Sequence, residues 1–284
     1  MDKRIAISAD STCDLTEELI AENNVNRMFF HITVDGEDYI DSQTITAKDI
    51  ERFYTEKKVL PKTSAANMSD YLNLFSDLRK QYDEVIHIGL SSGFSSTFQN
   101  AVLASRELDG VYCVDSHNLS SGCGLLVLKA ADMIREGIGA KDIAERLNEL
   151  RMNVHTSFIL SDLSFLAAGG RCSAVTAFGA NLLKIKPCIE VRQETGVMEV
   201  GNKYRGDFTT CAIKYIHDEL DKYDNIDYSR LFFTSTTLEA KTEEAVLNEL
   251  KSIGKFENIY RTSASCTITS HCGANCMGIL FMTK

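Results

Sequence analysis

The chain has 284 residues, 44% of them hydrophobic and 25% charged, a balance typical of globular proteins with a substantial core. Its formal net charge is −10, and no segment gathers Lys and Arg into the basic stripe that nucleic-acid binding needs. No stretch approaches the roughly 20 apolar residues of a membrane span, and the apolar run near the N-terminus is too short for a signal peptide. The nine cysteines then indicate buried thiols in a reducing compartment, and we expect a cytoplasmic protein.

The first half of the chain alternates short β-like runs with helical patterns. Helices are predicted after a cap at Asp14 or Thr16, and from about Ser95. Strands that alternate with helices predict a parallel, doubly wound sheet. The other predicted elements are strands at 4–9, 28–34, 83–90 and 111–115, and helices at 46–57, 67–80 and 120–136.

The second half has a different order of elements, with two β runs joined by a hairpin turn at Gln193–Gly196. Its strands are predicted at 157–160, 186–191, 197–201, 231–235, 257–262 and 276–282, and its helices at 162–168, 174–184, 208–221 and 238–253. We therefore predict an α/β fold of two domains. Residues 1–157 would form the doubly wound parallel sheet and residues 158–284 a mixed α/β unit.

Loops rich in hydroxyl groups follow the predicted strands of the first half, at the strand ends where parallel sheets bind ligands. They are Asp10-Ser11-Thr12, Gly89 to Thr97, and Asp115-Ser116-His117, and Pro61-Lys-Thr63-Ser64 stands before a further helix. Small residues at a helix N-terminus leave N–H groups free for an anion, to which hydroxyls can also donate. The loop at 91–97 is therefore predicted to hold an anion. The alternative is that its hydroxyls only cap two helices.

Two other kinds of site have partial support in the sequence. Gly89-Leu-Ser91-Ser-Gly93 matches the G-x-S-x-G nucleophile elbow, and His271 would complete the residue order of a serine esterase or related hydrolase. Cys272 and Cys276 form one C-x3-C pair near Cys266, but the second pair of a zinc site is absent, so we expect no metal.

Positive charge for an anion has to be supplied locally in so acidic a chain. Arg171 follows a glycine pair at the end of a predicted helix, and Arg205 follows a predicted strand. His271 precedes Gly273 in a predicted turn before the last strand. These three side chains are the candidates for binding the negative charge of an anion.

Taken together, these motifs resemble the bacterial DegV family over essentially the whole chain. The resemblance is carried by Ser8-Ala-Asp10-Ser11-Thr12, Pro61-Lys-Thr63-Ser64-Ala, Leu90-Ser-Ser-Gly-Phe-Ser-Ser-Thr-Phe-Gln-Asn-Ala, Asp115-Ser116, Gly169-Gly-Arg171-Cys-Ser, Leu183-Lys-Ile-Lys-Pro187, Arg205 and Ser270-His271-Cys-Gly273.

The resemblance implies two α/β domains with a long-chain fatty acid buried between them. The protein would be a carrier without catalytic residues or cofactor, presenting the lipid carboxylate to a partner kinase that forms an acyl phosphate. By motif, Thr63, Ser64, Ser92, Ser95 and His271 would bind the carboxylate. Arg171 and Arg205, with His271, would lie at the face of phosphoryl transfer.

The acyl chain needs a dry tunnel, for which the sequence offers these candidates: Phe29, Phe94, Phe98, Phe165, Phe178, Leu182 and Leu183. No nucleotide-binding loop is present, so ATP would come with the kinase. Gly206-Asp207 stands where similar proteins carry a threonine and then lysines, which weakens the positive charge available for docking. We expect at most transient contact with a membrane.

Overall fold

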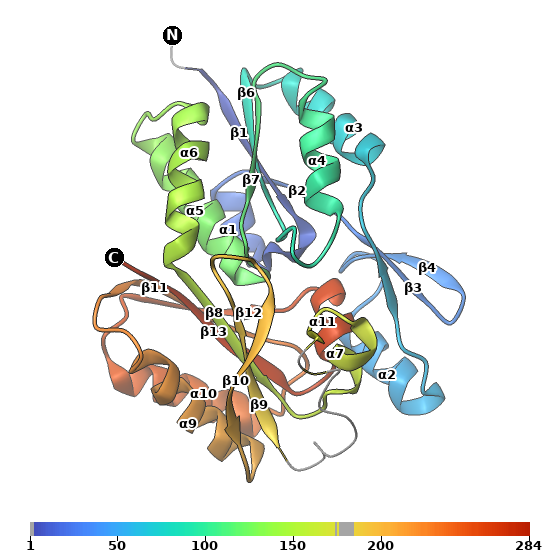
Figure 1. The fold of residues 1–284 in the computed structure, drawn as a ribbon, viewed down its shortest axis with the longest axis vertical. Coiled ribbons are helices and arrows are strands. Elements are labelled where there is room, and N and C mark those ends of the chain that lie inside the picture. Colours follow the sequence, from blue (N-terminus) through green and yellow to red (C-terminus); the bar gives the residue numbers. More distant parts are fainter. Residues whose placement is uncertain (1–2, 174, 176–184) are drawn as a thin grey trace.

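The computed structural model describes residues 3–173, 175 and 185–284, which form three sheets and the helices around them (Figure 1). The first is a four-stranded parallel sheet whose neighbours are, in order, β2 (Val25–Met28), β1 (Ile5–Asp10), β6 (Glu84–Gly89) and β7 (Val111–Asp115). Every residue of β6 is buried, as expected of a parallel strand covered on both faces.

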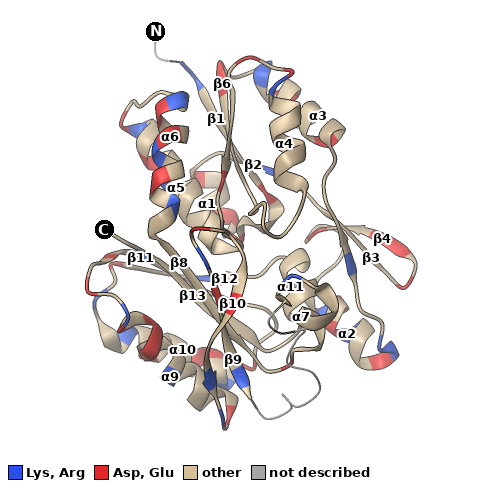
Figure 2. Ribbon diagram, in the orientation of Figure 1, with Lys and Arg blue, Asp and Glu red and all other residues tan. Residues whose placement is uncertain are grey.

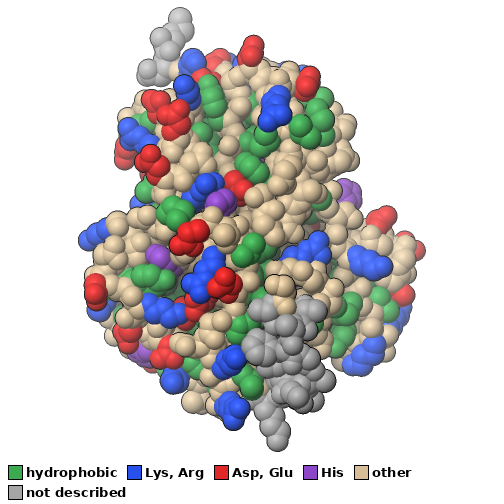
Figure 3. Space-filling model, in the orientation of Figure 1, with side chains coloured by type: hydrophobic (Ala, Val, Ile, Leu, Met, Phe, Trp, Pro, Cys, Tyr) green, Lys and Arg blue, Asp and Glu red, His purple; other side chains and the backbone are tan. Residues whose placement is uncertain are grey.

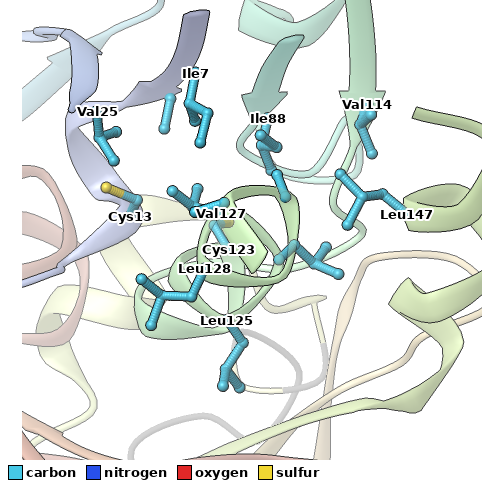
Figure 4. Packing of buried hydrophobic residues seen from close by; sticks show 14 of the residues in the cluster. Ile7, Cys13, Val25, Ile88, Val114, Cys123, Leu125, Val127, Leu128 and Leu147 are labelled. Atoms are coloured by element: carbon cyan, nitrogen blue, oxygen red, sulfur yellow. The ribbon is translucent and has the colours of Figure 1, made fainter. Parts of the chain in front are cut away.

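Helices cover both faces of the parallel sheet, which confirms the predicted doubly wound arrangement (Figure 1). One face carries α3 (Met68–Arg79) and α4 (Thr97–Ser105), and the other α1 (Glu17–Glu22), α5 (Ser121–Arg135) and α6 (Ala140–Leu150). Figure 4 shows Ile7, Ile88 and Val114 of the strands packing toward Val127 and Leu147 of α5 and α6. The same core continues to the second sheet through side chains such as Leu280, so α5 lies between the two sheets.

The second sheet has six strands: β10 (Met198–Tyr204), β9 (Lys186–Val191), β8 (Val154–Leu160), β13 (Cys276–Thr283), β11 (Ile226–Ser235) and β12 (Asn258–Ser263), in that spatial order. Only β11 and β12 pair in parallel among these described strands. The mixed α/β unit predicted for the second half is thus confirmed. Its outer face is covered by α9 (Phe208–Leu220) and α10 (Ala240–Ile253). Two single 3-10 turns complete these regions, at Ser11–Cys13 and Arg151–Asn153.

A third, antiparallel sheet was not predicted. It contains β4 (Glu37–Ile40), β3 (His31–Val34) and β5 (Lys62–Ser64) and packs with α2 (Ala47–Lys57), α7 (Ser164–Gly169) and α11 (Cys266–Cys272). The prediction of a single strand at 28–34 is therefore wrong. The chain leaves the parallel sheet after Met28 and enters the third sheet at His31.

The third sheet also joins the two halves of the chain. Ile32 and Ile50 share a buried cluster with Phe165 and Cys266. The predicted domain boundary at 157/158 falls inside β8, all of which pairs within the six-stranded sheet. The division into two domains at this boundary stays a prediction. The helix predicted at 174–184 lies almost entirely outside the described residues.

Charges of both signs are mixed along the outer helices, including α6 and α10 (Figure 2). On the face shown in Figure 3, hydrophobic side chains are scattered among them, and the only large hydrophobic side chains exposed in the described part of the chain are Leu103 and Met152. No helix among the described residues is long and apolar enough to cross a bilayer.

Candidate functional site

A cavity of about 140 Å³ lies where the loop after β6, strand β5 and helix α11 meet. Its polar lining consists of Thr63, Ser64, Ser95, Ser96, Arg171, Thr267 and His271. Its apolar lining consists of Phe30, Ala65, Leu90, Phe94, Leu119, Met198, Ile268 and Cys272. The cavity therefore joins hydrogen-bonding groups to an apolar wall, which is the composition of a site for a molecule with one polar end.

Two hydroxyl groups of the polar lining keep a hydrogen free for a ligand. Ser95 Oγ accepts from the backbone N–H of Thr97 at 3.2 Å, at the start of α4. Thr63 Oγ1 lies 2.9 Å from His271 Nε2, and if that nitrogen carries the ring proton, Thr63 accepts here as well. Each hydroxyl then accepts from the protein and can donate its own hydrogen into the cavity. The positive end of α4 adds to the attraction for an anion at the same place.

The imidazole of His271 is held without a charge of its own. Burial, with the nearby charge of Arg171 as a smaller cause, lowers its pKa to about 4. Its Nδ1 packs directly over Gly169, where any added Cβ would collide with it, and has no hydrogen-bond partner among the described residues. A neutral ring with a proton on Nε2 orients Thr63 as a donor while adding no buried positive charge.

Arg171 forms hydrogen bonds that connect two segments at the polar end of the cavity. Its Nε donates to the carbonyl of Phe94 at 3.3 Å and its Nη1 to that of Gly169 at 2.6 Å. The guanidinium thus links the loop after β6 to the end of α7. It also brings a permanent positive charge to the cavity.

Helix α11, which carries Thr267, Ile268 and His271, is fastened at its N-terminus by residues far away in sequence. Ser265 caps it by accepting from Ile268 N, and Ser265 N donates to Asp14 Oδ1 at 2.9 Å. Thr267 N donates to Asp41 Oδ1 at 3.1 Å. Carboxylates at a helix N-terminus offset its positive end. Burial nevertheless raises the pKa of Asp14 to about 7.

The loop after β6 rests on a buried polar network. Asp10 accepts from Leu90 N at 2.7 Å and from the Tyr71 hydroxyl at 2.5 Å. Because that hydroxyl has given its hydrogen to Asp10, Thr97 must donate to Tyr71 across their 2.7 Å contact. Burial raises the pKa of Asp10 to about 7 and lowers that of the adjacent His87 to about 3. The network fixes Leu90 and the start of α4 relative to β1.

A second, inner cavity of about 30 Å³ lies behind the first and shares Leu119, Ile268 and Cys272 with it. The surface that faces this cavity is mostly apolar. Its other lining residues are Phe158, Ala264, Cys276, Gly278 and Leu280, together with Ser120, Thr156, Ser157, Thr234, Ser235 and Thr236. Gly278 is required there because an added Cβ would lie 2.5 Å from the backbone oxygen of Ser157. The two cavities together run from hydroxyl groups at the surface to an apolar interior.

The sequence profile of the DegV family, a family described as uncharacterised, matches residues 4–284. The chain belongs to the DegV family. A DegV domain-containing protein of Caldanaerobacter subterraneus subsp. tengcongensis is 31% identical over 288 residues, which cover 99% of this chain and all of that protein. One from Clostridium acetobutylicum is 28% identical over 287 residues and covers 99% of each chain.

Solved structures of DegV proteins have the same fold over the full chain. A DegV family protein of Thermus thermophilus, described for its fatty acid binding, superposes with a TM-score of 0.91 at 26% identity, covering 99% of this chain and 100% of its own. DegV of Bacillus subtilis, described as a fatty acid binding protein, gives 0.84 at 26% identity with the same coverage. Both are proteins that hold a lipid with a carboxylate head group.

Six of the side chains predicted for a DegV site line the outer cavity: Thr63, Ser64, Ser95, His271, Arg171 and Phe94. Ser92 does not, and its backbone N–H is bound to Asp115. Arg205 is exposed at the far end of β10 and does not line the cavity. Phe178, Leu182 and Leu183 lie outside the described residues.

Three other predicted tunnel residues pack elsewhere. Phe29 faces Arg27, whereas its neighbour Phe30 lines the cavity. Phe98 packs against Gly89, and Phe165 lies against Tyr54 with ring centroids 4.6 Å apart. The sequence analysis missed Phe30, Ala65, Leu90, Ser96, Leu119, Met198, Thr267, Ile268 and Cys272. Of these, Ser96 stands inside the predicted anion loop at 91–97 and Leu90 directly before it, so both could have been found there.

The hydrolase alternative is not supported by the geometry. Ser91 is fully buried, and its hydroxyl donates to the carbonyl of Gly196 at 2.8 Å. His271 is bonded to Thr63 instead. A nucleophile needs an exposed hydroxyl next to a base, and Ser91 has neither.

Near the cavity, the described cysteines do not belong to any group with metal-ligand spacing. Cys266 Sγ donates to Ile45 O, away from His271. Among the described residues, one group has ligand atoms close enough together to hold a metal ion. It consists of Cys188, Glu190 and Glu219. The Lys222 ammonium already donates to both carboxylates of this group, at 2.8 Å to Glu190 and 2.7 Å to Glu219.

Proposed function

We propose that this DegV protein binds one long-chain fatty acid, with the carboxylate at Thr63 and Ser95 and the acyl chain running inward past Leu119. The observation that carries the proposal is the pair of adjoining cavities, polar at the outer end and apolar at the inner end. The fatty acid binding of the two solved relatives supports it.

The energetics fit such a ligand. Each buried methylene contributes about 0.8 kcal/mol, so a chain of about fifteen offers on the order of 12 kcal/mol before ordering costs are subtracted. The head group contributes orientation, because neutral hydroxyls and the end of α4 can bind a carboxylate without a second buried charge. Affinity should therefore follow chain length, and selectivity for an acid should follow the hydroxyls.

The first test is to purify the protein under native conditions, denature it and analyse the organic extract by mass spectrometry. About one equivalent of a long-chain fatty acid is the expected result. A well-folded protein that yields no lipid and takes up none from oleate would contradict the proposal.

We further propose that the bound carboxylate is presented to a separate kinase in the cytoplasm, which forms the acyl phosphate. The exposed Arg205 is available to such a partner, although Gly206 and Asp207 follow it where more positive charge would help docking. The domain division at 157/158, with the ligand between the domains, belongs to the same proposal. ATP and loaded protein alone should form no acyl phosphate, and steady turnover without a partner would contradict this role.

A further inference from the structure

Ser91, the serine of the Gly89–Gly93 motif, has no part in the proposed binding of the carboxylate. Its side chain is nevertheless fully buried and makes two hydrogen bonds. Ser91 Oγ donates to Gly196 O at 2.8 Å and accepts from Gly93 N at 3.1 Å. Gly196 ends the turn between β9 and β10, at the edge of the six-stranded sheet. Ser91 therefore ties the loop after β6 to a hairpin from the other sheet.

A second bond fastens the same hairpin tip. His117, in the loop after β7, has its Nδ1 2.7 Å from the carbonyl of Gln193. A carbonyl only accepts, so Nδ1 must carry the ring proton. His117 adopts φ +48°, a conformation that is unfavourable for residues other than glycine and that is often found at functional positions.

Two glycines allow the backbones to meet at this contact. A Cβ on Gly93 would lie 2.6 Å from Gly196 O, and one on Gly196 would collide with Ser91 Oγ and lie 3.0 Å from His117 Cα. Gly196 also has φ +65°. The hairpin tip and the two strand-end loops are thus shaped for close contact rather than brought together by large side chains.

The contact lies beside the lining of the outer cavity. Leu90, immediately before Ser91, lines the cavity, and so does Met198, two residues after Gly196. Beyond the last β8–β9 pair, at Glu190 and Ser157, the hairpin tip projects toward the parallel sheet (Figure 1). If the tip moved away, Met198 and Leu90 would separate and the cavity wall would open.

From this arrangement we infer that Ser91 and His117 are positioning residues that latch the β9–β10 hairpin across the cavity, and that a fatty acid enters and leaves when this latch opens. The inference rests on the proposed function. Neither Ser91 nor His117 lines either cavity, so loosening the latch should speed entry and exit together and leave the affinity nearly unchanged.

The test measures transfer of a fluorescent long-chain fatty acid between the full-length protein and neutral phosphatidylcholine vesicles, in both directions. Ser91→Ala and His117→Leu should each raise both rate constants about fivefold, the size expected when one net hydrogen bond is lost, with Kd within about twofold of wild type. His117→Asn keeps a donor and tolerates positive φ, and it should restore rates toward wild type. Thr242→Val removes a partly buried hydroxyl–hydroxyl bond between α9 and α10 and should lower Tm without changing the rates.

Rates within about twofold of wild type in both variants would overturn the latch, as would a faster exit with unchanged entry. A wild-type protein that binds no fatty acid would instead refute the proposed function, and the latch with it. If the variants do not fold, hydrogen exchange on the wild-type protein decides. The Gly196 amide, bonded to Arg192 O at 2.7 Å, should exchange more slowly with oleate bound, and equal rates would contradict the inference.

Discussion

The outer end of the cavity is lined by hydroxyl, imidazole and guanidinium groups, whereas the inner end is closed by side chains such as Phe158 and Leu280. The outer groups come from strand β5, the loop after β6, the segment after α7 and helix α11, and they are oriented by hydrogen bonds, as in the pairs Thr63–His271 and Ser95–Thr97. The inner wall comes mostly from strands β8, β11 and β13 and from helix α11, and its apolar side chains are positioned by packing. Recognition of the head group should therefore depend on single hydrogen bonds, and recognition of the tail on volume.

The strongest test of the outer end is Thr63→Val, which keeps the shape of the side chain and removes its donor. Loss of a hydrogen bond to a charged carboxylate, about 1.5–3 kcal/mol, should weaken palmitate binding about ten- to a hundredfold. Binding of the matching fatty alcohol should change far less. Titration calorimetry with both ligands measures the difference.

Thr33→Val is the matched control, because Thr33 lies in the neighbouring strand β3 and bonds to Asp38 outside the cavity. It should leave both affinities unchanged. Equal losses for acid and alcohol in Thr63→Val would show that the outer end contributes shape rather than charge recognition.

The inner end is tested by Ala264→Leu, which fills part of the inner cavity of about 30 Å³. The preferred acyl chain should become shorter by one or two methylenes, and each methylene that no longer fits should reduce affinity about fourfold. A competition assay over saturated acids of increasing length measures the shift. Ala144→Leu makes the same change in α6, away from both cavities, and should lower stability while leaving the length preference intact.

A further test concerns the uncharged His271 and the pH dependence of stability. Its pKa is about 4 in the folded protein and near 6.5 when unfolded, so the unfolded chain binds more protons between these values. Stability should fall as the pH drops from about 6.5 toward 4, and His271→Asn should make that fall shallower. Urea unfolding at pH 7 and pH 5 measures it. Above pH 7 both proteins should follow parallel curves, and identical slopes at low pH would mean that the ring is already charged.

The outer end was the more predictable of the two from sequence. Thr63, Ser95 and His271 stand in short polar motifs at element ends, where a parallel sheet directs its ligands. The strand-helix order of the first half and the hairpin at Gln193–Gly196 were likewise readable from local patterns.

The inner end was not predictable, because it depends on which face of each element turns inward. Phe29 and Phe30 show this, since the chain changes sheets between Met28 and His31 and Phe30 faces the cavity instead of Phe29. His271 was expected in a turn, but it lies in helix α11, which was not predicted. Its Cys, Thr and Ile residues have low helix propensity, and its start depends on Asp14 and Asp41, which no local pattern links to it.

The hydrogen bonds that hold the N-terminus of α11 also determine at which stage of folding the polar lining of the cavity can form. The bond from Ser265 to Asp14 joins residues 251 positions apart, and Ser265 caps the helix that carries His271. Contacts of such long range form late in folding, and a chain emerging from the ribosome has its first strands long before its last helix. A nascent chain therefore lacks the polar lining that α11 supplies until residues 265–272 have left the ribosome.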